Sequence, residues 1–116
     1  MITKEQKIIN LVQDKLPIKI FPERFVLPKL RENFSPDIKL DTILEIHSMF
    51  DNGNEGGITC EILPLNTDRP SVKSVFLASL THFRVKVGEP HFELLEKYRT
   101  DRIRKLKQQN SRPGFR

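Results

Sequence analysis

The fold is decided by residues 51–63, which read DNGNEGGITCEIL. The first seven of these residues include three glycines and two asparagines, and they form the strongest turn signal in the chain. From Ile58 to Ile62 apolar and polar side chains then alternate, which is typical of a β-strand. The sequence therefore predicts that one element ends at this turn and that a strand follows it.

Upstream of the turn, the apolar residues follow a helical period. Proline suits the first turn of a helix because it has no amide to leave unbonded. We therefore expect a helix that begins near Pro36 or at Asp41 and ends at Phe50. Its apolar stripe would consist of Leu40, Ile43, Leu44, Ile46, His47 and Phe50.

Two further elements are expected before this helix. Thr3 and Gln6 have the spacing of a helix capping box, and apolar residues recur at helical intervals until Pro17 stops the run. From Pro17 to Pro36 the chain contains four prolines and no helical period. Because proline cannot donate to a β-ladder, this second segment predicts an edge strand or an extended arm at best.

Downstream of the first strand, a second turn at residues 66–70 precedes a β-rich run from Val72 to Val87. Alternate residues from Val75 to Val87 fall in one register. The run is long for a single strand, so we expect a break or bulge near residues 79–81. A final helix should begin after Pro90 and reach about Gln109.

This order of elements predicts one α+β domain over residues 1–110. A small antiparallel sheet built on a hairpin would carry helices packed on one face, and a long basic helix would close the domain. Residues 111–116 would form a flexible tail.

Composition limits the class of protein. Hydrophobic residues make up 37% of the chain, and the longest apolar runs are too short to span a bilayer. The first residues lack the apolar core of a secretory signal. The single cysteine, Cys60, fits a reducing compartment. We therefore expect a cytoplasmic protein with no membrane partner.

Charge is distributed unevenly along the chain. The net charge is +5, yet residues 84–116 hold ten basic and four acidic side chains, whereas residues 40–68 hold six acidic and no basic ones. A basic segment attracts an anionic partner, most often nucleic acid or an acidic protein surface. Alternatively, the basic end docks on the acidic middle of its own chain or of a second copy.

The last helix is the most informative element for function. Phe92, Leu95, Ile103 and Leu106 fall within about 80° on a helix of 100° per residue, with Arg99 in the middle of this stripe. A partly buried arginine normally needs a carboxylate, which the acidic middle of the chain or a partner chain is expected to provide. The candidate partner-binding residues are Lys97, Arg99, Arg102, Arg104, Lys105 and Lys107.

The sequence predicts no metal, no cofactor and no catalytic group. Residues 51–62 approach the pattern of a calcium loop, but Gly53 and Ile62 stand where oxygen ligands are needed. Cys60 and His82 could pair as nucleophile and base. However, Cys60 alternates with core residues, and a buried thiol stays protonated. The three histidines have no zinc-ligand spacing.

Three hypotheses about function follow. The first is a small non-enzymatic adaptor or regulatory module whose basic C-terminal helix binds an acidic protein surface or a second copy of the chain. The runner-up is a nucleic-acid-binding protein that uses the same helix, although no zinc finger, RNP motif or GXXG loop is present. An enzyme of unknown class ranks third.

Overall fold

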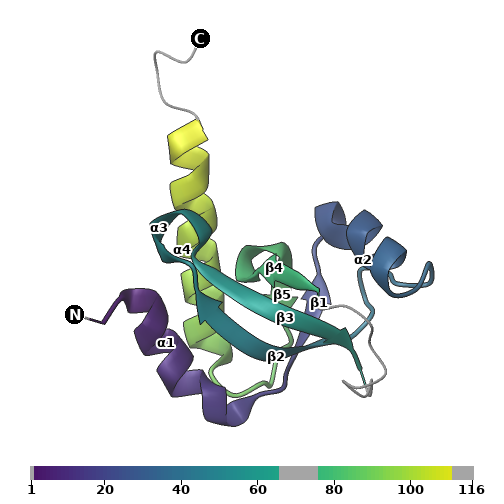
Figure 1. Cartoon of the computed structure of the whole chain (residues 1–116), viewed down its shortest axis with the longest axis horizontal. Coiled ribbons are helices and arrows are strands. Elements are labelled where there is room, and N and C mark those ends of the chain that lie inside the picture. The colour runs from purple at the N-terminus through teal and green to yellow at the C-terminus, as the bar shows by residue number, and fades with distance from the viewer. Residues whose placement is uncertain (1, 66–75, 111–116) are drawn as a thin grey trace.

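A computed structural model describes residues 2–65 and 76–110 as a five-stranded sheet with helices around it (Figure 1). The strands lie in the order β4-β3-β2-β1-β5, and every neighbouring pair is antiparallel. Their bounds are β1 Ile18–Pro22, β2 Leu44–Asp51, β3 Ile58–Pro64, β4 Leu77–Ser79 and β5 Phe83–Val85. The helices are α1 Lys4–Val12, α2 Leu27–Asn33, α3 Gly53–Gly56 and α4 Phe92–Asn110, with 3₁₀ turns at Gln13–Lys15, Arg24–Val26 and Leu80–His82. The predicted α+β fold is confirmed.

The core lies between the sheet and the helices α1, α2 and α4. In the centre of the sheet Ile46 is paired with both Ile18 and Ile62, and all three side chains are fully buried. α1 packs mainly on β2, whereas α4 packs on β5 and on the Leu80–His82 turn. The helices thereby keep water from one side of the central strands, which is the main source of stability in such a layered domain.

The two terminal helices form where local signals predict them. Thr3 caps α1, since its side-chain oxygen accepts a hydrogen bond from the Gln6 amide at 2.9 Å. The Gln6 side chain donates a hydrogen bond to the side chain of Asn10, one turn further along the same helix. α4 begins two residues after Pro90. None of the helices in residues 2–65 and 76–110 is both long and apolar enough to cross a membrane.

The prediction for residues 17–36 is wrong in two respects. β1 is not an edge strand, because β2 pairs with one side of it and β5 with the other. Its proline, Pro22, lies at the last position. The following residues form a 3₁₀ turn and then α2, with Pro28 in the first turn of that helix. Proline costs little there because first-turn amides have no partner within the helix.

The predicted helix that ends at Phe50 is also wrong, since Leu44–Asp51 is strand β2. A β-bulge between Ile46 and Ser48 places two residues of β2 opposite one residue of β3. The buried residues are therefore Leu44, Ile46 and Met49, spaced by two and then by three. Such mixed spacing imitates a helical period and explains the error.

The β-rich run divides as predicted but does not keep one register. The expected break is the 3₁₀ turn Leu80–His82, which separates β4 from β5. Leu77 is exposed, whereas Phe83 and Val85 are buried, so the turn changes which alternate residues face the core. The predicted turn at residues 66–70, the start of the run at residues 72–75 and the tail at residues 111–116 lie outside the described residues.

Candidate functional site

α4 meets the rest of the molecule through a side that differs from the predicted apolar stripe. Leu95 is fully buried, as expected, but Phe92, Ile103 and Leu106 are only half-buried. Among residues 92–108 of the helix, the other buried side chains are Tyr98 and Arg102. The packed side therefore follows residues 95, 98 and 102, a spacing of three and four that is normal for a helix on a sheet. One of the six candidate cations is thus part of the packing.

Arg99 belongs to a network of ion pairs that fastens α4 to the sheet. Its guanidinium donates to Glu96 at 3.0 and 3.2 Å and to Glu23 at 3.4 Å. Glu96 also accepts a hydrogen bond from the backbone amide of Val85 at 2.9 Å, and Glu23 lies 3.0 Å from Arg84. The side chain of Arg99 is only 11% exposed. The network therefore occupies this cation within its own chain.

The prediction that Arg99 pairs with a carboxylate is confirmed, but the expected origin of that carboxylate is wrong. A carboxylate does accompany the arginine, but it comes from Glu23 and Glu96 and not from the acidic middle of the chain. Glu23 follows β1, and β1 pairs with β5, on which α4 packs. Because the sequence suggested an arm at this place, nothing in it indicated that Glu23 would lie beside α4.

Arg102 and Tyr98 pack against a glycine of the turn between β2 and β3. Gly57 has a φ of +61°, and a Cβ atom there would lie 2.5 Å from Arg102 Nε and 2.8 Å from the Tyr98 hydroxyl. Tyr98 donates its hydroxyl proton to Glu5 at 3.1 Å. Burial, and then the charge of Glu5, raises the pKa of Tyr98 to about 12. Tyr98 thus joins α4 to α1, and Arg102 fits against the turn.

The remaining four candidate cations lie on the surface of α4. Lys97, Arg104, Lys105 and Lys107 are exposed. Asp101 lies among them, 2.9 Å from Lys97 and 3.9 Å from Arg104. The hydrogen bond from Lys97 is the main reason that the pKa of Asp101 is lowered. The positive surface is therefore smaller than the sequence suggests.

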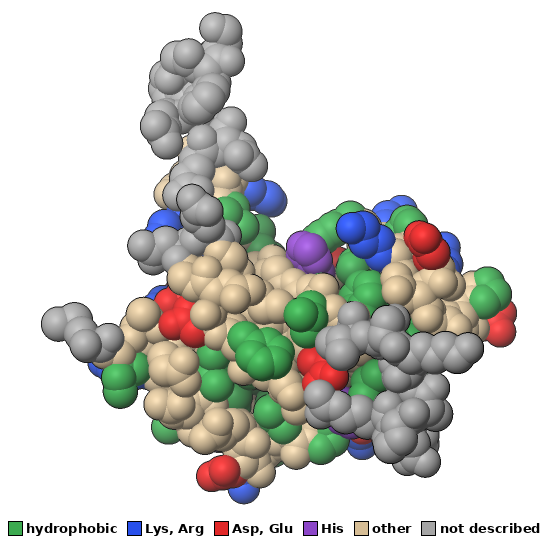
Figure 2. Space-filling model, in the orientation of Figure 1, with side chains coloured by type: hydrophobic (Ala, Val, Ile, Leu, Met, Phe, Trp, Pro, Cys, Tyr) green, Lys and Arg blue, Asp and Glu red, His purple; other side chains and the backbone are tan. Residues whose placement is uncertain are grey.

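A groove separates the second half of α4 from strand β4. Its volume is about 440 Å³, and its lining includes Leu77, Ala78 and Ser79 of β4, His82 of the following turn, and Arg102 and Leu106 of α4. Figure 2 shows the surface hollowed beside the projecting end of α4, with basic and apolar side chains on the flank of the helix. Around α4, Lys105 and Lys107 lie about 100° to either side of Leu106. Lys97 and Arg104 lie on the side of the helix opposite the groove.

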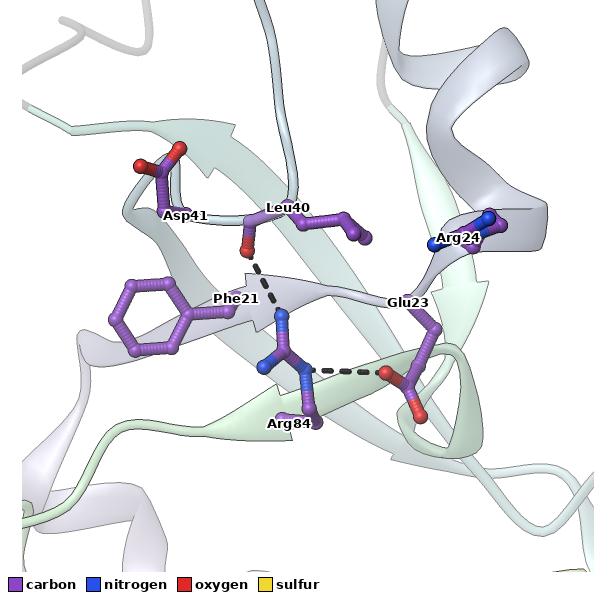
Figure 3. Close-up of a pocket in the computed structure, with 6 residues that line it drawn as sticks. All are labelled: Phe21, Glu23, Arg24, Leu40, Asp41 and Arg84. Atoms are coloured by element: carbon purple, nitrogen blue, oxygen red, sulfur yellow. Dashed lines mark hydrogen bonds and ion pairs between the residues drawn. The ribbon is translucent and has the colours of Figure 1, made fainter.

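A second hollow of about 480 Å³ lies around Arg84 (Figure 3). Arg84 donates to the carbonyl oxygens of Leu40 at 2.8 Å and Pro22 at 3.1 Å, and its guanidinium lies 5.5 Å from the centre of the Phe21 ring. In Figure 3 the charged side chains of Asp41 and Arg24 lie at opposite ends of the hollow. Arg84 ties β5 to the segment before β2, and the other charges do not converge on one point.

The groups that the sequence suggested for catalysis or calcium binding are packed or hydrogen-bonded within the fold. Cys60 is fully buried as predicted, and burial raises the pKa of its thiol. His82 meets Phe25 edge to face, with 4.9 Å between the ring centres, and burial followed by the charge of Lys29 lowers its pKa. In the turn that approaches a calcium loop, Asp51 accepts hydrogen bonds from the Gly53 amide and from Thr3. Cys60 is thus part of the core, whereas His82 and Asp51 have contacts within their own chain.

No family model, curated protein or solved structure matches this chain.

Proposed function

We propose that the protein is a non-enzymatic binding module that contacts an acidic protein through its C-terminal helix. The observation that supports this proposal is the exposure of Lys97, Arg104, Lys105 and Lys107 on α4. Arg99 and Arg102, which the sequence placed in the same group, hold the helix in position through Glu23 and the turn at Gly57. α4 therefore has one set of cations for its own packing and another for a partner.

Half-buried apolar residues next to these cations favour a protein partner over a nucleic acid. Ile103 and Leu106 lie between the basic positions of α4, and Leu106 lines the groove beside β4. Protein interfaces combine an apolar centre with a charged rim, whereas attraction to phosphates depends mainly on cations. Asp101 also offsets part of the positive charge. Binding of a nucleic acid by the same cations is the competing proposal.

The test is a comparison of two variants with equal net charge. In the first, Lys97, Arg104 and Lys107 are replaced by Glu, and in the control variant the exposed Lys7, Lys15 and Lys39 are replaced by Glu. Binding of a labelled poly-glutamate peptide and of a mixed pool of nucleic acids is measured by fluorescence anisotropy across a salt series. Circular dichroism checks that both variants keep the fold.

We expect the α4 variant to lose about tenfold or more in affinity for the acidic peptide, and the control variant to lose less than about threefold, because charges at an interface act locally. Equal losses in the two variants would show that net charge alone is responsible and would overturn the proposal. Binding of nucleic acid about tenfold tighter than of the peptide, with a steep salt dependence, would establish the competing proposal instead.

A further inference from the structure

The two edges of the sheet differ in how their backbone groups are used. At the β5 edge, the amide of Val85 donates to Glu96 of α4, so the helix covers that edge. β4 forms the opposite edge, and no strand of residues 2–65 or 76–110 pairs with its outer side. An open edge of this kind presents unpaired amides and carbonyls, onto which another strand can add.

The register identifies which groups of β4 point outward. The amide of Ile62 donates to the carbonyl of Phe76 at 3.0 Å, so Phe76 bonds toward β3. In an antiparallel pair such residues alternate with residues whose backbone groups point away from the neighbour. The amides and carbonyls of Leu77 and Ser79, the next alternate residues, therefore face outward.

The groove runs beside this edge. Leu77, Ala78 and Ser79 form its β4 side, whereas Arg102 and Leu106 form the helix side. Strand and helix are thus placed as in the known recognition mode in which an extended peptide pairs with an edge strand and its alternate side chains enter pockets. Leu77, which is 53% exposed, and Leu106 would contact apolar side chains of such a peptide.

We infer that the acidic partner binds as an extended segment that adds a strand to the outer edge of β4, in the groove against α4. This inference rests on the proposed function and specifies the conformation of the partner. Its acidic character follows from charge: Arg102 lines the groove, and the exposed Lys105 and Lys107 lie about 100° to either side of Leu106 around α4. A segment that alternates apolar and acidic residues would place its apolar side chains against Leu77 and Leu106 and its acidic side chains toward these cations.

The probe for the test is a labelled peptide of about ten residues in which valine and glutamate alternate, since a strand of this length spans β4 and its flanks. Two further peptides carry N-methyl groups on the odd or on the even residues. A methyl group removes a backbone donor but keeps the side chains and their charge. An added strand directs only alternate amides toward β4, so one methylated peptide should lose binding and the other should keep it.

Two substitutions of Leu77 test the same contact from the protein side. Leu77→Pro removes an outward amide, whereas the matched Leu77→Thr keeps the amide and changes only the side chain. We expect Leu77→Pro to lose about tenfold or more in affinity and Leu77→Thr to lose less than about threefold. Binding should also slow the amide hydrogen exchange of Leu77 and Ser79. The methylated peptides keep the test valid even if Leu77→Pro disturbs the fold.

The outcomes separate this inference from the proposed function. If both methylated peptides bind as well as the parent peptide, or if neither does so and exchange at Leu77 is unchanged, strand addition is wrong. The proposed function still stands in that case if reversal of Lys105 and Lys107 to Glu abolishes binding. If the parent peptide does not bind, or if ultracentrifugation shows that a second copy occupies the β4 edge, the inference is overturned.

Discussion

The two halves of α4 contain similar cations in different surroundings. In the packed half, residues 92–102, Arg99 pairs with two carboxylates and Arg102 is buried against Gly57, whereas Lys97 is exposed. In the projecting half, residues 103–110, Arg104, Lys105 and Lys107 are exposed, and Figure 1 shows this end of the helix extending past the sheet. A basic helix therefore does not define a partner surface by its composition. Which cations are free depends on what the fold places beside each of them.

The largest difference between the halves should be in stability. Leu95 is fully buried in the packed half, whereas Leu106 in the projecting half is half-buried. Leu95→Ala should lower the free energy of unfolding by about 2–5 kcal/mol because it leaves a cavity in the core. Leu106→Ala should lower it by about 1 kcal/mol or less. Urea denaturation measures both values, and equal losses would mean that the packed half does not dock as described.

A second test concerns the turn that receives Arg102. Gly57→Ala should destabilise the fold by about 2–4 kcal/mol, since the methyl group meets Arg102 and Tyr98 and the positive φ is unfavourable for alanine. Gly53 also has a positive φ, of +77°, but nothing lies within 4 Å of an added Cβ. Gly53→Ala should therefore cost only about 1 kcal/mol. Thermal unfolding of the two variants compares a site with both backbone strain and a steric clash to a site with backbone strain only. A similar fall in melting temperature for both would contradict the close packing of Arg102.

A third test compares one arginine from each half. Arg99→Met removes a cation that Glu23 and Glu96 share, and we expect a loss of about 1–2 kcal/mol, reduced by the partial exposure of both carboxylates. Arg104→Met in the projecting half should change stability by less than about 0.5 kcal/mol. The measurement is the denaturation midpoint in low and high salt. A larger loss of stability for Arg104→Met than for Arg99→Met would mean that Arg104, and not Arg99, is the cation that stabilises the fold.

The contrast also shows what the sequence could and could not predict. α1, strand β3, the break at Leu80–His82 and α4 depend on caps, turns and periodicity within a few residues, and all were predicted. β2 was missed because its bulge gives Leu44, Ile46 and Met49 a helix-like spacing. The central position of β1 depends on pairing with strands more than twenty residues away, which local patterns do not contain.

The residues of the candidate site could be predicted from the sequence, but their surroundings could not. The six cations of α4 could be counted in the sequence, but their burial could not. Arg99 pairs with Glu23, which is 76 residues away in the sequence. Arg102 lies against Gly57, and only the folded structure shows that these two residues are neighbours. The groove beside β4 arises from an edge strand and a helix that are not adjacent in the sequence. Long-range contacts thus divide the cations into structural and available ones.

The smallest effect at neutral pH should come from the hydroxyl of Tyr98 in the packed half. Its pKa is raised to about 12 from the model-peptide value of 10.0, first by burial and then by Glu5. Well below pH 10 the tyrosine is protonated in both the folded and the unfolded chain, so it causes no pH dependence there. Between pH 10 and 12 the unfolded chain loses this proton while the folded chain keeps it, so stability falls as the pH rises.

Tyr98 is the only tyrosine in the chain, so its ultraviolet absorbance reports its own titration directly. We expect the folded protein to titrate well above the denatured protein, and Tyr98→Phe to lose less stability than the wild type between pH 10 and 12. The comparison with Tyr98→Phe isolates the contribution of this one hydroxyl group. A tyrosine that titrates at its ordinary pKa in the folded protein would mean that α4 does not hold Tyr98 against Glu5, and the boundary between the packed and the projecting half would then lie closer to Leu95.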